Sequence, residues 1–257
     1  MPPVTSKEML ADGLDAELLA LAKVMEQRYG DLTPREWGER VTGVITRIDT
    51  SDKVIALTFD ACGASGLSAG YDRELIDFLT QEQIPATLFL SGQWIEANKQ
   101  IARELAQNPL FVIENHGYRH RPLSVAGKNA YGIEGTGSIR EVVAEIGLND
   151  RLIKELTGRA PVYYRSGTAY YDEVAVMIAR DMGKEVINFN VLGDAGATFS
   201  NAQIEKNLLG AKPGAIILYH MNRPESDTAA ALIETLPKLQ EQGFRFVHLR
   251  EYHKHLK

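Results

Sequence analysis

The residues best suited to chemistry are two histidines four positions apart, His116 and His120, where an apolar run (110–113) gives way to a polar loop. Neutral imidazoles bind divalent metals well, and on one helical turn a pair at this spacing points the same way, so both rings can reach one ion. The pair alone is weak evidence. Two other strand-like runs also end in ionisable groups, Asp60 and His220, which predicts that all three ends meet at one site.

Asp60 and His220 each allow a functional and a structural interpretation. Asp60 directly follows the apolar run 54–59 and precedes small residues, so we expect a partly desolvated carboxylate whose pKa is raised by burial, as suits a general base. The structural alternative is a turn or helix N-cap aspartate, a common role at a strand end. The structural alternative for His220 is a satisfied core histidine, but the polar stretch 222–225 that follows favours a functional role.

Composition places the chain among globular proteins. Of its 257 residues, 44% are hydrophobic and 24% are charged, and no run of 18 apolar residues occurs. A formal net charge of −6 and a pI near 5.6 lack the basic field that nucleic acid or anionic lipid requires, which excludes both as main partners. At this length a single α/β barrel domain can bury a large core.

The compartment is only weakly indicated. Cys62 is the single cysteine, so no disulfide can form within the chain. Residues 1–7 contain no apolar stretch of signal-peptide type. We expect an exported protein, periplasmic or extracellular, whose signal segment lies outside this sequence, with a cytoplasmic location as the alternative. The sequence indicates no oligomeric state.

The order of apolar patterns predicts an α/β fold. Residues 14–29 carry apolar residues at helical spacing, which predicts an N-terminal helical extension, residues 1–50, packed on a catalytic domain, residues 51–257. In that domain about seven β-rich runs alternate with amphipathic runs, as in a parallel sheet with helices outside. The predicted strands are 54–60, 86–91, 110–116, 162–166, 186–192, 216–221 and 244–249, and the predicted helices are 73–81, 94–107, 138–157, 173–182, 201–209 and 228–242.

An open doubly wound sheet and a closed barrel both fit this alternation, and both place their active sites at the carboxyl ends of strands. Five candidate residues follow the apolar parts of five different strands, which favours the ring of loops of a (β/α) barrel; they are Asp60, His116, Arg165, Asp194 and His220. No glycine-rich dinucleotide or Walker loop follows the first strand, so a nucleotide phosphate has no evident binding loop.

Five short motifs occur in a characteristic order. The first is Thr58-Phe59-Asp60, the second is the histidine pair, the third begins at Arg165, the fourth supplies Asp194, and the fifth is Leu218-Tyr219-His220. Together they resemble the NodB-homology polysaccharide deacetylases, the family-four carbohydrate esterases, which remove N-acetyl groups from amino-sugar polymers. The likeness covers roughly residues 54–249.

The resemblance implies a distorted (β/α) barrel and a divalent metal, usually zinc. It also implies a role for each of the motif residues. His116 and His120 are implied to bind the metal and Asp60 to accept the proton of the attacking water. Arg165 is implied to orient Asp60. His220 is implied to protonate the leaving amine, and Asp194 to tune His220. A structural turn is the alternative for Asp194.

The sequence departs from the family at Ala61. The family's first motif is Thr-Phe-Asp-Asp, and its second aspartate completes the metal ligands, so a catalytic zinc here needs another donor or extra water. Asp60 is one candidate ligand, in which case Glu114 becomes a candidate base. Cys62 is a softer option, but we expect it to pack under a loop.

The third motif also departs from the family's Arg-x-Pro-Tyr, because Gly167 and Thr168 replace the last two residues. A backbone N–H near Thr168 or Tyr170 is the expected oxyanion donor. Aromatic residues near the strand ends offer flat faces to sugar rings, and the expected substrate contacts are Tyr170, Tyr118, Tyr219 and Thr168.

These observations predict a metal-dependent hydrolase that removes N-acetyl groups from amino-sugar residues of a polysaccharide, such as peptidoglycan, a chitin-like polymer or an exopolysaccharide. Loss of the second aspartate leaves two alternatives. One is a metal-free hydrolase of small amides on the same fold, and the other is a degenerate protein that only binds glycan. The presence of an acid, a base and metal ligands together argues against the second.

Overall fold

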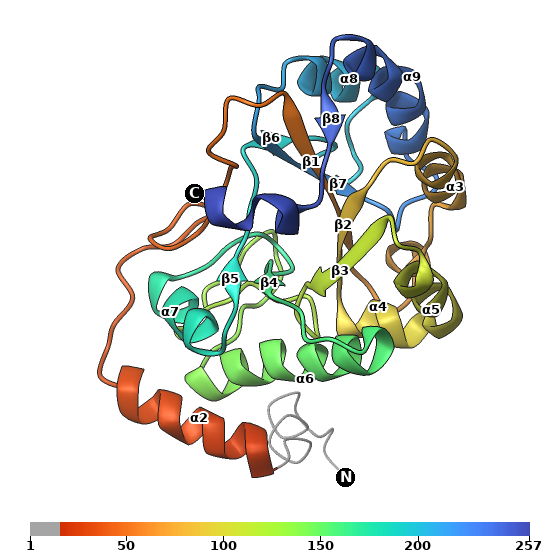
Figure 1. The fold of residues 1–257 in the computed structure, drawn as a ribbon. Coiled ribbons are helices and arrows are strands. Elements are labelled where there is room, and N and C mark those ends of the chain that lie inside the picture. Colours follow the sequence, from red (N-terminus) through yellow and green to blue (C-terminus); the bar gives the residue numbers. More distant parts are fainter. Residues whose placement is uncertain (1–15) are drawn as a thin grey trace.

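The structure, a computed structural model, describes residues 16–257 (Figure 1). At its centre lies an eight-stranded parallel sheet in the order β5-β4-β3-β2-β1-β7-β6, with β8 pairing with β1 outside this path. The strands are β1 (Val54–Ala61), β2 (Ala86–Leu90), β3 (Phe111–Asn115), β4 (Tyr163–Tyr164), β5 (Glu185–Val186), β6 (Val191–Leu192), β7 (Ala215–His220) and β8 (Arg245–Phe246).

The sheet curls into a distorted barrel. β5 and β6 lie at its two edges, yet only residues 187–190 join them. A connection this short spans at most roughly 17 Å, so the two edges lie near each other. The predicted barrel is therefore confirmed, but the predicted strand 186–192 is two strands. The chain leaves the ladder between them because the carbonyls of Ile187 and Asn188 accept hydrogen bonds from the buried Arg165 side chain.

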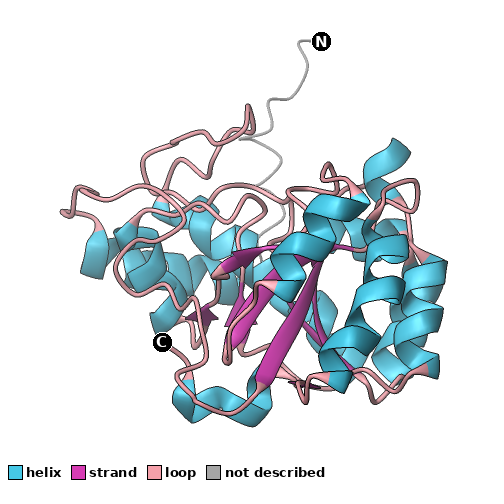
Figure 2. Ribbon diagram, turned by 90° about the horizontal axis from the view of Figure 1, so that it is seen from above, coloured by secondary structure: helices cyan, strands magenta, loops and turns pink. Residues whose placement is uncertain are grey.

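Helices surround the sheet (Figure 2). They are α2 (Ala16–Tyr29), α3 (Arg73–Gln81), α4 (Gly92–Ala97), α5 (Lys99–Gln107), α6 (Ile139–Thr157), α7 (Glu173–Asp181), α8 (Asn201–Leu209) and α9 (Thr228–Glu241), with the 3-10 helices η1 (Gly66–Ala69) and η2 (Leu249–His255). The predicted helix 94–107 breaks at Asn98, whose backbone is not helical and whose side chain donates to the carbonyls of Ala69 and Trp94. Within residues 16–257, the helices lack the length and apolarity needed to span a membrane.

Helix α2 packs on the outside of the barrel. Leu18 contacts α6 so closely that a Cβ on Gly147 would lie 2.4 Å from it, and the Tyr29 hydroxyl donates to Asp181 on α7 at 2.7 Å. The chain then returns to the barrel, where Gly38 pairs with Tyr171. The start of the predicted helix, at 14–15, lies outside the described residues. A division into an extension 1–50 and a domain 51–257 stays a prediction.

Strand β1 positions the site through its alternation. Ile55, Leu57 and Phe59 point outward and join the core beneath the helices. Thr58 and Asp60 occupy the opposite face, toward the barrel interior, because successive side chains of a strand point to opposite sides. Asp60 therefore reaches the barrel mouth while staying 3% exposed.

Candidate active site

The predicted site residues meet at the carboxyl ends of the strands. Asp60 on β1 pairs in register with His220, the last residue of β7. His116 directly follows β3 and Arg165 directly follows β4. Asp60, His120 and His220 line one cavity of about 390 Å³, in the size range of small-molecule sites. The expectation that separate strand ends form one site is confirmed by this geometry.

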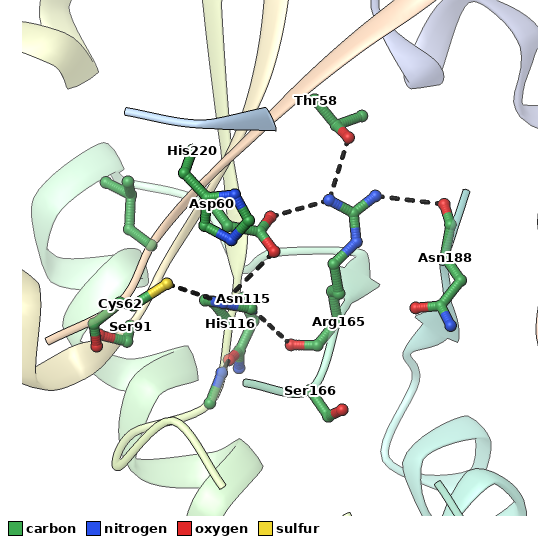
Figure 3. Close-up of polar contacts among 12 residues, drawn as sticks. Thr58, Asp60, Cys62, Ser91, Asn115, His116, Arg165, Ser166, Asn188 and His220 are labelled. Carbon is green, nitrogen blue, oxygen red and sulfur yellow. Dashed lines mark hydrogen bonds and ion pairs between the residues drawn. The ribbon is translucent and has the colours of Figure 1, made fainter. Parts of the chain in front are cut away.

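Asp60 is held by a buried arginine. Arg165 Nη1 donates to Asp60 Oδ1 at 2.8 Å and to Thr58 Oγ1 at 3.0 Å, and Arg165 is fully buried (Figure 3). Burial raises the pKa of the Asp60 carboxyl, but nearby positive charges, those of Arg165 and His220 among them, outweigh burial and the pKa is lowered from 3.8. The expectation of a raised pKa is therefore wrong, because the sequence does not show that the guanidinium is adjacent. Asp60 is held as a carboxylate, ready to accept a proton.

His116 is oriented by the backbone. Its Nδ1 lies 3.0 Å from the carbonyl oxygen of Arg165, which leaves Nε2 facing Asp60 Oδ2 at 3.4 Å and Cys62 Sγ at 3.8 Å (Figure 3). A carbonyl on one ring nitrogen fixes which nitrogen is free to bind a metal. Burial lowers the pKa of His116, so the ring is neutral, as a metal ligand must be.

His120 reaches the site from a loop, not from the helical turn that the spacing suggested. Its φ is +59°, and the backbone N–H groups of Arg119 and Arg121 donate to the buried carboxylate of Glu145. Gly167 lies directly against this loop, since a Cβ there would be 2.2 Å from the carbonyl carbon of His120. The rings of His116 and His120 lie 4.9 Å apart between centroids.

Cys62 completes a group of three metal-binding side chains. Ligand atoms of Cys62, His116 and His120 all lie within 4.8 Å of one another. The alternation of β1 explains this, because position 62 continues the inward face of residues 58 and 60, whereas Ala61 points into the outer core. Burial opposes ionisation of the thiol, but His120 and His220 lower the pKa of Cys62 from 9.0 to about 7. Cys62 therefore lies among the histidines of the site, and the expectation that it only packs under a loop is wrong.

His220 and Asp194 form a second charged pair. Asp194 is fully buried, and its two oxygens accept hydrogen bonds from the His220 backbone at 2.7 Å and from Nδ1 at 2.8 Å. Burial lowers the pKa of His220, but Asp194 outweighs it and raises the pKa well above 6.5. The imidazole is therefore protonated near neutral pH. The alternative of an isolated turn aspartate is not what the structure shows.

The four predicted sugar contacts lie in different places relative to the cavity. Thr168 lines the cavity, and its buried Oγ1 has no hydrogen-bond partner among residues 16–257. Tyr170 packs beside the cavity against Trp37. Tyr118 lines a separate depression next to Glu96. Tyr219 is fully buried in the outer core, stacked on Phe59, so its predicted sugar contact is wrong: it has the outward parity of β7.

Glu114, the alternative base, has a structural role instead. Its carboxylate accepts hydrogen bonds from Val162 N, Tyr163 N and Arg250, and so holds the start of β4 and η2. Two further residues at the site are not predicted by the sequence. Glu39 lines the cavity and Asn188 supports Arg165. Neither carries a local sequence signal, because each is brought to the site by a connection that only the closed barrel defines.

A family model described as polysaccharide deacetylase matches residues 47–187, more than half of the chain. The chain belongs to the polysaccharide deacetylase family. It is therefore a hydrolase of the polysaccharide deacetylase type, and the predicted family membership is confirmed.

Relatives and solved structures agree with this family. A peptidoglycan-N-acetylglucosamine deacetylase of Bacillus cereus is 26% identical over 216 residues, 82% of this chain and 93% of the relative. The peptidoglycan-N-acetylglucosamine deacetylase of Listeria monocytogenes is 30% identical over 204 residues, which cover 78% of this chain but 39% of the relative.

Among solved structures, a peptidoglycan N-acetylglucosamine deacetylase superposes with a TM-score of 0.69 at 25% identity, covering 82% of this chain and 92% of that one. A family-four pseudoenzyme from Bacillus anthracis superposes with a TM-score of 0.68 at 24% identity, covering 87% and 70% of the two chains. The latter shares the fold of this chain.

Proposed function

We propose that this protein removes acetyl groups from N-acetylated amino-sugar units of a polysaccharide, with a divalent metal, zinc, held by Cys62, His116 and His120. One observation carries the proposal: the Asp60 carboxylate, the protonated His220 and two of the three clustered metal-binding side chains, Cys62 and His120, line the same cavity, with His116 directly behind them. A protein that only binds glycan has no physical need for this combination.

The side chains fit a zinc ion. A thiol and two imidazoles are ligands that zinc prefers, and three protein ligands leave a position open for chemistry. The Arg165 carbonyl on His116 Nδ1 is the kind of outer contact that orients a metal-binding imidazole. When bound, the metal supplies Lewis-acid polarisation of the acetyl carbonyl and makes water more acidic.

Asp60 serves as the base in this proposal. Arg165 holds one carboxylate oxygen, so that the other, Oδ2, is directed toward His116 and the site. Its lowered pKa keeps the group ionised over the working range of a hydrolase, and its position beside His116 lets the ionised form accept the proton of the attacking water. Arg165 positions this carboxylate and does not itself face the cavity.

His220 serves as the acid. Its Nδ1 is engaged by Asp194, which leaves Nε2 to donate a proton to the nitrogen of the departing amine. Asp194 keeps the ring protonated until that step. Thr168, with an unpartnered hydroxyl at the cavity, provides a hydrogen bond to the substrate.

Acetate release from N-acetylglucosamine oligomers and from peptidoglycan tests the proposal. Asp60→Asn and His220→Ala should each lower kcat at least about a hundredfold, since each removes a proton-transfer group. Chelation should abolish release and zinc should restore it. Release that is equal in both variants and the parent would refute the assignment.

Since relatives are named for peptidoglycan, we further propose that the protein is exported and meets its polymer outside the cytoplasm.

A further inference from the structure

Three aromatic rings from separate segments meet beside the cavity. Trp37 follows α2, Tyr131 precedes α6, and Tyr170 follows β4. The ring of Tyr170 lies 5.7 Å from that of Trp37 and 5.4 Å from that of Tyr131. Tyr131 lines the cavity and is 73% exposed. The exposed Tyr131 ring packs on Tyr170, which in turn packs on Trp37, so Tyr131 presents an apolar face with a polar tip, suited to a sugar ring.

A carboxylate stands next to these rings. Glu39 lines the same cavity, and the Tyr131 hydroxyl donates to its Oε1 at 3.3 Å. Two cationic side chains that line the cavity are already paired, His220 with Asp194 and Arg223 with Glu225. Glu39 itself forms no ion pair with any residue in the described part of the chain. Its negative charge is thus left for a ligand, and a carboxylate offers only hydrogen-bond acceptors.

Glu39 is fixed relative to the reacting groups. Its backbone carbonyl accepts a 2.6 Å hydrogen bond from Asn188 Nδ2, and Gly38 pairs with Tyr171 in both directions. The carbonyl of Asn188 in turn accepts from Arg165 Nη2 at 3.1 Å, and Arg165 holds Asp60. Glu39 precedes residue 47, where the family match begins, so this lining residue comes from outside the matched segment.

We propose that Glu39 and Tyr131, the latter backed by Tyr170 and Trp37, form a sugar subsite next to the reacting acetamide, which accepts uncharged or cationic amino-sugar units and disfavours units that carry a carboxylate. The aromatic face packs on the sugar, and Glu39 accepts hydrogen bonds from its hydroxyl or ammonium groups. An anionic unit brings a second negative charge to Glu39, which makes this residue a source of specificity by repulsion. The inference rests on the proposed function.

The test compares Glu39→Gln with the parent on two tetrasaccharides, one of N-acetylglucosamine alone and one alternating N-acetylglucosamine with N-acetylmuramic acid. With zinc-loaded protein, kcat/KM on the neutral oligomer should fall about tenfold, mainly through KM, because a hydrogen bond to a charged group is lost. On the anionic oligomer kcat/KM should rise about fivefold as the repulsion is removed. Glu134→Gln, an exposed residue near Tyr131 that does not line the cavity, is the matched control and should change neither.

Calorimetric binding of the same two oligomers repeats the comparison without catalysis. If the parent releases no acetate from either, the proposed function fails, while the binding ratio still decides the subsite. Equal changes on both oligomers, or none, in Glu39→Gln would overturn the inference. Unchanged thermal unfolding of the variant excludes misfolding as the cause.

Discussion

Cys62 and Asp60 are separated by one residue but perform different tasks in the proposed site. Both lie on the inward face of β1 and its continuation, so both reach His116. Asp60 is tied to Arg165, whereas Cys62 shares its surroundings with His120. A guanidinium partner suits a carboxylate that must stay ionised, and a soft sulfur between two imidazoles suits a zinc ligand. This division removes the need for an aspartate at position 61.

Metal content separates the two roles. Cys62→Ser should weaken zinc binding at least about a hundredfold, because losing a ligand costs more than losing an outer contact. Asp60→Asn should keep zinc at one ion per chain and lose activity. Zinc measured by mass spectrometry after equilibration with a competing chelator checks both. The reverse pattern, with zinc kept in the serine variant and lost in the asparagine variant, would make Asp60 the ligand, as the sequence first suggested.

At this scale the sequence predicts the identity of charged residues better than their electrostatic state. Asp60, Arg165 and His220 stand out by type and position, but the lowered pKa of Asp60 depends on a guanidinium 105 positions away. Cys62 lacks a partner motif, so its role follows only when His116 and His120 are seen beside it. Tyr219 could have been rejected from the sequence, since it has the opposite parity to His220 on the same strand.

Among the elements, the loop that carries His120 depends on its contact with the loop after β4. Gly167 passes so close to His120 that a side chain does not fit, and the atoms it would meet are backbone. The family's proline at this position is absent here, and the glycine allows the approach that brings His120 to His116. The two loops therefore act as one unit.

Gly167→Ala tests this coupling. The added Cβ must displace the His120 backbone, so we expect weaker zinc binding, lower kcat and a loss of about 1–3 kcal/mol in the free energy of unfolding. Gly137→Ala is the control, because a Cβ there would meet only the Gly127 Cα at 3.8 Å. Zinc affinity and urea unfolding are the measurements. Parent-like behaviour of both variants would mean that the loops adjust independently.

Element boundaries follow the sequence where local chemistry defines them. Helix α3 begins and ends where predicted, with Asp72 capping it by accepting from Leu75 N. The predictions fail where distant contacts decide: Asn98 breaks a continuous helical pattern, and Arg165 draws the carbonyls of residues 187 and 188 out of a continuous strand pattern. A periodicity argument contains no information on such contacts.

At the scale of the whole molecule, the C-terminal helix η2 is bonded to the barrel through Glu114. This carboxylate on β3 is fully buried, and it accepts hydrogen bonds from Arg250 Nε of η2 at 2.8 Å and from the backbone N–H groups of Val162 and Tyr163 at the start of β4. One side chain thus joins two neighbouring strands to the end of the chain. In the sequence Glu114 lies two residues before His116 and so on the same face of an extended strand, a position that also fits a catalytic base.

Arg250→Gln should destabilise the fold in a pH-dependent way. Burial raises the pKa of Glu114 above 4.5 even though Arg250 lowers it, and removing Arg250 raises that pKa further. A raised folded-state pKa contributes stability below pH 4.5 that is lost as pH rises, since the ionised carboxylate is then left buried without its partner. The loss in the free energy of unfolding should therefore be small near about pH 4 and reach about 2 kcal/mol near about pH 8, less than for a fully buried pair because Arg250 is partly exposed.

Urea unfolding at both pH values measures this loss. The exposed Arg245→Gln is the control, with an expected loss under about 0.5 kcal/mol. A loss independent of pH would show that Arg250 acts through packing and not through its charge on Glu114.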